Sequence, residues 1–245
     1  MSIPRFYCPT ILAPGAIVSL PPNAAAHASK SLRLKVGDKA VLFNGDGNDY
    51  GCEFVGFQKS NVTAKIRSVS HNNSESPLNI TLAQAISSGD RMDFTLQKSV
   101  ELGVTAIQPI ASQRSVVKLT GERAEKRREH WQNVVISACE QSGRAVVPEV
   151  AAPLSLPAWL AGLPSFTMRL TMSPFATDAL HELPSPTGSV CLLIGCEGGL
   201  TDSEIAMASN NDFRPIKLGR RILRTETAPL AALAAMQTLW GDFKQ

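Results

Sequence analysis

In the first 70 positions, hydrophobic and polar residues alternate in short runs, which is the pattern of half-buried β-strands. Apolar residues at positions 62, 64 and 66 alternate with Thr, Lys and Arg. The runs 40–43 and 50–57 are joined by the turn-rich sequence NGDG at 44–47 and indicate a hairpin. Several short strands in so few residues predict a small β-barrel.

A polar stretch, HNNSESP at 71–77, follows the predicted barrel and ends in proline. Such a composition is typical of a connection between domains. We therefore predict a first domain at 1–72 and a second domain at 73–245.

Longer periodic segments follow the connection, and short apolar runs alternate with amphipathic ones. This alternation predicts an α/β domain with a largely parallel sheet. Strands are expected at 79–85, 104–110, 166–170, 190–194 and 214–218, and helices at 90–102, 122–142 and 228–240.

Composition narrows the class of protein. Hydrophobic residues make up 44% of the 245 positions, which is enough for a sizeable core. The net charge of +3 gives no global sign of a nucleic acid partner, so any basic surface would have to be clustered. The five cysteines form no Cys-x-x-Cys pair, which favours reduced thiols and no metal site. Without a signal-peptide pattern or a long apolar run, a soluble cytoplasmic protein with no membrane partner is expected.

The sequence LLIGCEGGL at 192–200 places one carboxylate, Glu197, in a glycine-rich loop directly after an apolar strand. Ligands of parallel α/β sheets bind at this end of the strands. Thr201 and Glu204 have the spacing of a capping box, so the loop leads into a helix. The glycine spacing matches neither a dinucleotide loop nor a phosphate loop. Glu197 suits a ligand with ribose hydroxyls or positive charge, or it simply favours the positive end of the following helix.

A second stretch, KLGRRILRTETAPLAALAAMQ at 217–237, also follows a predicted strand. Three arginines lie next to Thr225, Glu226 and Thr227, and Pro229 lies near the start of a helix. Such clustering at a strand–helix junction is unusual for a merely solvated surface and favours ligand contact.

Together the two stretches resemble the SPOUT class of RNA methyltransferases. More narrowly, the chain is similar to the RsmE-type enzymes, which methylate uridine N3 in the 16S ribosomal RNA of the small subunit. The similarity covers nearly the whole chain in order: Arg5 in PRFY, LRLKVGD (32–38), NGDG (44–47), SGDRMDFTLQKSVELGV (88–104), ACEQSGR (138–144), LLIGCEGGLTDSEI (192–205) and LGRRILRTETAPL (218–230).

The resemblance implies an N-terminal PUA-like β-barrel that helps to bind RNA. It also implies an α/β domain whose C-terminal part, at about 167–230, is threaded as a trefoil knot, whereas unknotted connections are the general rule. A homodimer is implied, with S-adenosylmethionine held in the knot loops. The implied substrate is 16S ribosomal RNA, within the small ribosomal subunit.

Methylation at N3 requires alignment of the reacting atoms, removal of the N3 proton and stabilisation of the charge that develops on the neighbouring carbonyl oxygens. Arg224 is the predicted stabiliser of this charge, and Glu197 and Glu226 are weaker candidates for the base. An ion pair between Arg224 and one of these glutamates is the alternative interpretation.

Cofactor contacts are expected mainly from the backbone, with Leu218, Ile222 and Leu223 lining an apolar slot for adenine. The predicted cofactor residues are Leu170, Thr171, Met172, Gly195, Glu197, Gly198, Gly199, Leu218, Gly219, Ile222, Leu223, Thr225 and Thr227. The family usually has proline at the position of Cys196. A nucleophilic role for this thiol is disfavoured, because methylation at a nitrogen needs no covalent adduct.

Predicted RNA contacts come from both domains. Arg5, Lys30 and Arg33 match family positions, and Arg220 and Arg221 lie in the second loop. The stretch 114–144 has seven Lys and Arg residues against four Asp and Glu residues, and its ends Arg114 and Arg144 are also predicted to contact RNA. For the helix within this stretch, a solvated face is the favoured interpretation.

Two rival functions remain open. A non-catalytic RNA-binding or ribosome-assembly protein would keep the barrel and lose the cofactor loops. A SPOUT methyltransferase with another RNA target, such as transfer RNA, would keep both. A hydrolase is the weakest alternative, because the sequence has no nucleophile elbow and no metal-ligand cluster.

Overall fold

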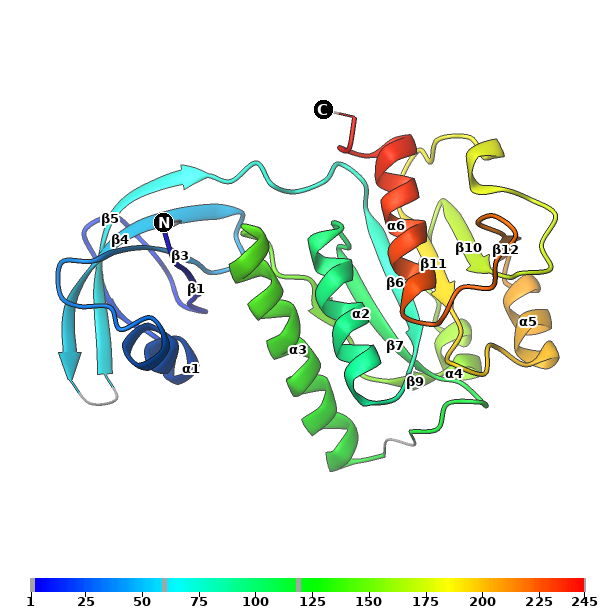
Figure 1. Ribbon diagram of the computed structural model, residues 1–245, viewed down its shortest axis with the longest axis horizontal. Helices are drawn as coiled ribbons and strands as arrows, with labels where there is room; N and C mark the ends of the chain where they lie inside the picture. Colours follow the sequence, from blue (N-terminus) through cyan, green and yellow to red (C-terminus); the bar gives the residue numbers. More distant parts are fainter. Residues whose placement is uncertain (1–2, 59–60, 118–119, 245) are drawn as a thin grey trace. The chain divides into compact units, whose positions relative to one another are not determined.

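The computed structural model describes residues 3–58, 61–117 and 120–244, and these form two compact units (Figure 1). The first unit contains the residues up to Glu75 together with Cys139–Val147. The second contains Ser76–Ala138 and the residues from Pro148 onwards. The predicted first domain at 1–72 includes residues 1, 2, 59 and 60, which lie outside the described residues. The predicted boundary after residue 72 stays a prediction.

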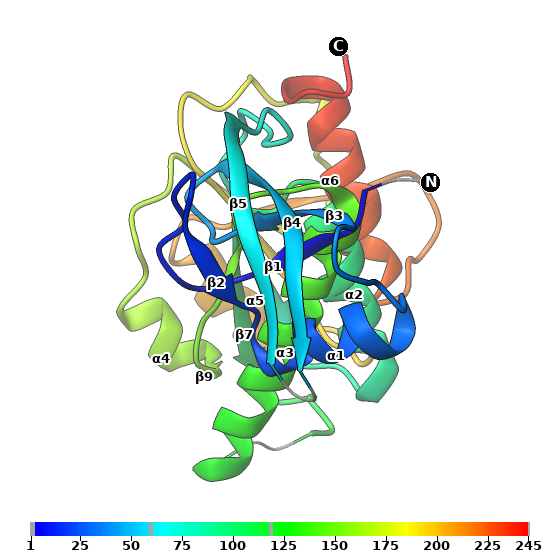
Figure 2. The same cartoon turned by 90° about the vertical axis from the view of Figure 1, so that its left-hand side faces the viewer.

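The first unit is built on a five-stranded sheet whose order is β1-β3-β4-β5-β2 (Figure 2). β1 runs parallel to β3, and the other pairs are antiparallel. Phe6, Phe54 and Ile66 are among the fully buried residues that form its core. The strands are β1 (Arg5–Tyr7), β2 (Ile17–Ser19), β3 (Lys39–Phe43), β4 (Asn48–Gln58) and β5 (Asn61–His71), and α1 (Pro22–Ala26) continues into a π-helical turn at His27–Ser31.

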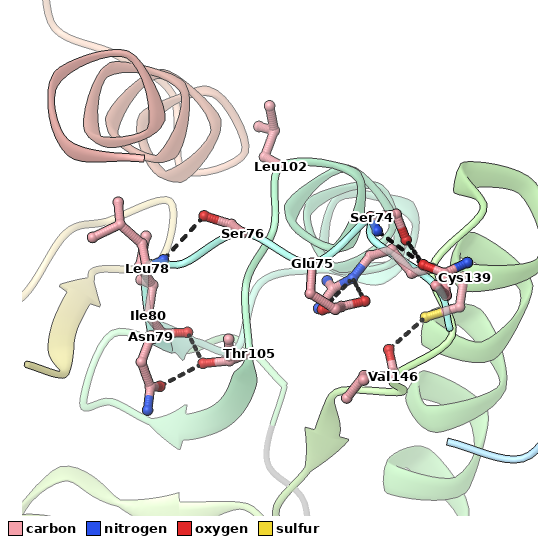
Figure 3. Close-up of polar contacts among 12 residues, drawn as sticks. Ser74, Glu75, Ser76, Leu78, Asn79, Ile80, Leu102, Thr105, Cys139 and Val146 are labelled. Atoms are coloured by element: carbon pink, nitrogen blue, oxygen red, sulfur yellow. Dashed lines mark hydrogen bonds and ion pairs between the residues drawn. The ribbon is translucent and has the colours of Figure 1, made fainter. Parts of the chain in front are cut away.

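Part of the predicted connection is tied to this unit. The Asn72 amide donates hydrogen bonds to Asp49 and to the Gly143 carbonyl, at 3.1 and 3.0 Å. The Ser74 hydroxyl donates to the Gly143 carbonyl at 3.1 Å, and close by the Cys139 thiol donates to the Val146 carbonyl at 3.6 Å (Figure 3). Residues 72–75 are therefore held by the first unit and do not form a free linker.

The second unit contains a parallel sheet with the order β12-β10-β11-β6-β7-β8, and β9 pairs with β7 beyond this path. All of its strand pairs are parallel. The strands are β6 (Ile80–Ala85), β7 (Ala106–Ala111), β8 (Glu149–Val150), β9 (Leu154–Ser155), β10 (Met168–Met172), β11 (Val190–Ile194) and β12 (Arg214–Ile216). The helices are α2 (Gly89–Glu101), α3 (Glu122–Ser142), α4 (Leu156–Ala161), α5 (Asp202–Ser209) and α6 (Thr227–Trp240), with a 3₁₀ turn at Leu180–Glu182.

Helices cover the parallel sheet. α2 and α6 contact each other, and Figure 1 shows both running along the sheet. α4 and α5 pack together over a cluster that contains Trp159, Phe213 and Leu193. Within the described residues, no helix combines the length and hydrophobicity that a membrane span requires.

The α/β organisation predicted from the sequence is confirmed. The helix at 122–142 and the strand at 190–194 have the predicted bounds. The strand expected at 166–170 instead occupies Met168–Met172, because residues 166 and 167 precede the pairing with β11. The short elements β8, β9 and α4 had no periodic signal long enough to predict them.

Candidate active site

Three loops of the second unit follow neighbouring parallel strands at their carboxyl ends. Residues 173–175 follow β10, residues 195–200 follow β11, and residues 217–225 follow β12. The carboxyl ends of parallel strands share one edge of the sheet, so the three loops meet there. They line a pocket of about 470 Å³.

Most of the predicted cofactor residues line this pocket. Leu170 and Thr227 do not: Leu170 is fully buried in β10, and Thr227 is the first residue of α6. The predicted residues that line it are Thr171, Met172, Gly195, Glu197, Gly198, Gly199, Leu218, Gly219, Ile222, Leu223 and Thr225. The structure thus brings the two glycine-containing stretches together at one pocket, as the family resemblance implied.

The glycine loop folds back on itself at Gly195. A Cβ at this position would lie 2.9 Å from the Gly199 carbonyl carbon and from the Leu200 amide nitrogen, so a side chain has no room. Gly199 has a φ of +69°, in the left-handed region that favours glycine. The Thr225 hydroxyl donates to the Gly195 carbonyl at 2.7 Å and joins the loop after β12 to the loop after β11.

The Glu197 carboxylate is fixed by the N-terminus of α2. One oxygen accepts hydrogen bonds from the Ser88 N–H at 2.9 Å, the Ser88 hydroxyl at 2.8 Å and the Arg91 guanidinium at 3.1 Å. Glu197 therefore does favour a helix N-terminus, but it is that of α2 and not of the following helix. α5 has its own partner, because Thr201 and Glu204 form the predicted capping box.

These contacts control the protonation of Glu197. Burial by itself raises the pKa of this carboxyl, but the hydrogen bonds from Ser88, from the Glu197 backbone and from Arg91 outweigh it. Together they lower the pKa to about 2. A carboxylate with so low a pKa is a poor proton acceptor, so the structure argues against the predicted role of Glu197 as the base.

Arg91 also approaches the second predicted carboxylate. Its Nε lies 4.0 Å from an oxygen of Glu226, so one arginine of α2 pairs with Glu197 in the glycine loop and with Glu226 at the start of α6. Among the described residues no ion pair involves Arg224, which is exposed and lines the pocket. The alternative in which Arg224 pairs with one of these glutamates is therefore not the arrangement found.

Cys196 is one of the residues that line the pocket, but it is only 4% exposed. Its thiol donates to the Gly199 carbonyl at 3.6 Å, and the Ser112 hydroxyl lies 3.5 Å from its sulfur. These contacts are those of a side chain that stabilises the loop.

Of the three predicted RNA contacts in the second unit, one is bonded to the glycine loop and two are exposed. The Arg114 guanidinium donates to the carbonyls of Gly198 and Leu200, at 2.8 and 3.3 Å, and so supports the glycine loop. Arg220 and Arg221 are exposed, and Arg221 lines the pocket.

Two predicted RNA contacts of the first unit are occupied by the protein itself. Arg144 is 3% exposed, and its guanidinium forms hydrogen bonds to the Glu75 carboxylate. Arg5 forms a bidentate pair with Asp49, both bonds at 2.8 Å. These contacts correct the prediction for Arg144, because a buried, paired guanidinium has no surface to offer a phosphate. Arg33 and Lys30 are both exposed, and Lys30 lies in the π-helical turn His27–Ser31, which ends two positions before Arg33.

Sequence reasoning missed the residues that fix the loops. Ser88 and Arg91 lie in a quoted motif, yet nothing in their spacing indicated a contact with Glu197. Phe175 also lines the pocket, and nothing in the sequence around it, SPFAT at 173–177, indicated a ligand contact. Lys217 lines the pocket too, but it belongs to the stretch 217–237 that was expected to contact a ligand. A ligand-binding role for the residues directly after β10 could have been inferred from the sheet topology alone.

The chain is similar to known RNA methyltransferases in sequence and in structure. The RNA methyltransferase domain family matches residues 74–237, and the RNA methyltransferase PUA domain family matches residues 20–67. The ribosomal RNA small subunit methyltransferase E of Buchnera aphidicola (Schizaphis graminum) is 38% identical over 98% of both chains. The protein of the same name from Neisseria gonorrhoeae, solved bound to S-adenosyl methionine, is 48% identical, with a TM-score of 0.92 over 99% of this chain and 100% of that one. A Legionella pneumophila methyltransferase solved with the cofactor SAM is 39% identical, with a TM-score of 0.96 over the same shares.

Proposed function

The chain belongs to the RNA methyltransferase domain family, and from this premise we propose that it uses S-adenosylmethionine to methylate N3 of a uridine in 16S ribosomal RNA. The relatives' names support ribosomal RNA of the small subunit as the substrate. The observation that carries the proposal is the pocket of three loops, in which Gly195 lets backbone approach backbone and Thr225 locks two of the loops together.

The pocket fits the cofactor in size and in lining. Its volume of about 470 Å³ lies within the range of small-molecule sites, roughly 300–1,000 Å³. Leu218, Ile222 and Leu223 offer apolar surface for adenine, and the glycine loop offers backbone polar groups to the rest of the molecule. When bound, S-adenosylmethionine supplies an electrophilic methyl group.

The protein's own residues then act on the uracil. Loss of the N3 proton spreads negative charge onto the flanking carbonyl oxygens, and the exposed guanidinium of Arg224 is available to stabilise it. Glu226 remains a candidate to accept the proton, directly or through a water, because Glu197 is held ionised by α2. The pocket walls align the reacting atoms and exclude water.

The remaining predictions are part of the same proposal. The PUA-like unit binds RNA through Arg33 and Lys30, and the substrate RNA lies within the small ribosomal subunit in the cytoplasm. The segment at about 167–230 is knotted, and the enzyme is a homodimer. The family resemblance supports these features.

The test is methylation of three purified RNAs: small ribosomal subunits, free 16S ribosomal RNA and transfer RNA, each taken from cells that lack this activity. Tritiated cofactor gives the rate, and mass spectrometry of the digested nucleosides identifies the methylated atom. We expect 3-methyluridine in the 16S RNA of the subunits. Methyl groups in transfer RNA, or at another atom, contradict the proposal. Cofactor binding without transfer to any RNA would favour a non-catalytic RNA-binding protein.

A further inference from the structure

Phe175 is the most exposed large apolar residue among those the structure describes, at 92% of its surface. A single exposed apolar side chain is ordinary on a protein surface. Phe175, however, lines the pocket, and so does Ile222, which is 82% exposed. Two large apolar side chains exposed at one pocket indicate a surface that a ligand covers.

Hydrogen bonds hold the backbone around Phe175, whereas its ring is exposed. The Ser173 N–H donates to the Ile216 carbonyl at 2.9 Å, so this segment continues from the sheet. The Phe175 N–H donates to the Ser173 hydroxyl and the Ala176 N–H to the Ser173 carbonyl, both at 3.3 Å. None of the ring contacts among the described aromatic residues involves Phe175. A short turn therefore presents a free aromatic face at the pocket.

The other groups at this pocket complement a nucleobase. Arg221 and Arg224, from the loop after β12, are exposed and line it. A uracil has an apolar face for stacking and carbonyl oxygens for guanidinium groups, and enzymes that modify a base take it out of its stack. Aromatic stacking recognises such a base whatever its neighbours in the sequence.

We propose that Phe175 is the stacking platform for the target uracil, holding the unstacked base at the pocket while Arg224 faces its carbonyl oxygens. The proposal rests on the proposed function and adds the residue that positions the base. Phe175 is a positioning residue here and takes no part in proton or methyl transfer.

The first test separates RNA from cofactor. Phe175→Ala is expected to lower kcat/KM for the RNA about ten- to hundredfold, as loss of one stacked base does, and to leave the cofactor Kd within twofold. Phe175→Tyr and Phe175→Trp should retain activity, and Phe175→Leu, which is apolar but has no aromatic face, should not. Phe94→Ala is the matched control, because Phe94 is 45% exposed on α2 and does not line the pocket.

Full activity of Phe175→Leu would overturn the proposal, because mere apolar contact would then suffice. An equal loss of cofactor affinity in Phe175→Ala would also overturn it and make the ring part of the cofactor wall. A change in the oligomeric state of Phe175→Ala, measured by sedimentation, would instead assign the ring to contact with a second copy of the chain.

A second measurement detects the stacking from RNA binding alone, without methyl transfer. The fluorescence of Phe175→Trp should be quenched by a uridine-containing RNA in the presence of S-adenosylhomocysteine, and that of Phe94→Trp should be unchanged; absence of quenching contradicts the stacking. If the parent protein methylates no RNA, the proposed function fails by itself. If the parent is active and Phe175→Ala is equally active, only the role of Phe175 fails.

Discussion

The Ser88 backbone N–H and hydroxyl both donate to the same oxygen of Glu197, at 2.9 and 2.8 Å, although 109 positions separate the two residues. The contact joins the N-terminus of α2 to the glycine loop after β11. It explains why a single carboxylate lies among glycines: a loop with little side-chain packing needs an anchor, and a helix N-terminus attracts an anion. Arg91 extends the anchor to Glu226, and thus to the loop after β12.

Loosening this anchor should weaken cofactor binding. We expect Arg91→Gln to raise the Kd for S-adenosylmethionine about tenfold, since it removes one charge-assisted hydrogen bond to Glu197 and the contact with Glu226. Calorimetric titration measures the change. Lys98→Gln is the control, because Lys98 forms an exposed pair with Glu101 at the other end of the same helix. An unchanged Kd in Arg91→Gln would show that Ser88 alone suffices.

The pKa of Glu197 gives the anchor a defined dependence on pH. Because the folded protein lowers this pKa from 4.5 to about 2, the ionised carboxylate stabilises the folded loop. The contribution is complete above about pH 4.5 and is lost as the pH falls towards 2. Glu197→Gln should therefore weaken cofactor binding by the same factor from pH 5 to pH 8. A difference from the parent that disappears below pH 6 would mean that the carboxyl titrates near neutrality.

Gly195 should tolerate no side chain. Gly195→Ala places a methyl group 2.9 Å from backbone atoms of the same loop, so the loop has to move. We expect cofactor binding to fall beyond calorimetric detection while the circular dichroism spectrum keeps its α/β form. Gly162→Ala is the matched control, because a Cβ there meets nothing within 4 Å and its φ of −113° suits any residue. Normal binding in Gly195→Ala would place the cofactor away from this loop.

A contact could be predicted from the sequence where the two partners are close together in the chain, and not where they are far apart. The capping box of Thr201 and Glu204 spans three positions, so the sequence was sufficient to predict it, as it was for the strand at 190–194. The partner of Glu197 lies in another loop, and only the pairing of β6 with β11 brings Ser88 beside it. The same applies to Arg144, whose partner Glu75 lies in a stretch read as a linker. Motifs located the pocket walls, but the anchors depend on topology that no local pattern encodes.

Arg224 should matter for transfer and not for cofactor binding. Among the described residues it forms no ion pair, so its substitution leaves no buried partner without a charge. We expect Arg224→Gln to lower kcat at least about 100-fold, as loss of a group that stabilises developing charge does, with the cofactor Kd within about threefold. Single-turnover assays with excess enzyme measure this step. Arg123→Gln, at an exposed position of α3, serves as the control, and an equal rate in Arg224→Gln would remove this residue from the chemistry.

Substitution of Arg144 can distinguish an arginine that stabilises the fold from one that binds RNA. Its side chain is 4% exposed, and its Nε and Nη2 donate to the two oxygens of Glu75, at 3.1 and 2.5 Å. Arg144→Ala removes charge-assisted hydrogen bonds and leaves the Glu75 carboxylate, a quarter of which is exposed, without its partner. We therefore expect a loss of about 2 kcal/mol in the free energy of unfolding, measured by urea titration.

The matched variant is Arg67→Ala, in the same unit. Arg67 pairs with Glu53 at 3.0 Å, but half of its side chain is exposed, so its removal should change the free energy of unfolding by less than about 0.5 kcal/mol. RNA affinity separates the two interpretations of Arg144. If Arg144→Ala unfolds at the same urea concentration as the parent but binds RNA more weakly, with a reduced dependence on salt, its guanidinium contacts phosphate after all. If stability falls and the folded fraction binds RNA normally, its role is to hold residues 72–75 against the end of α3.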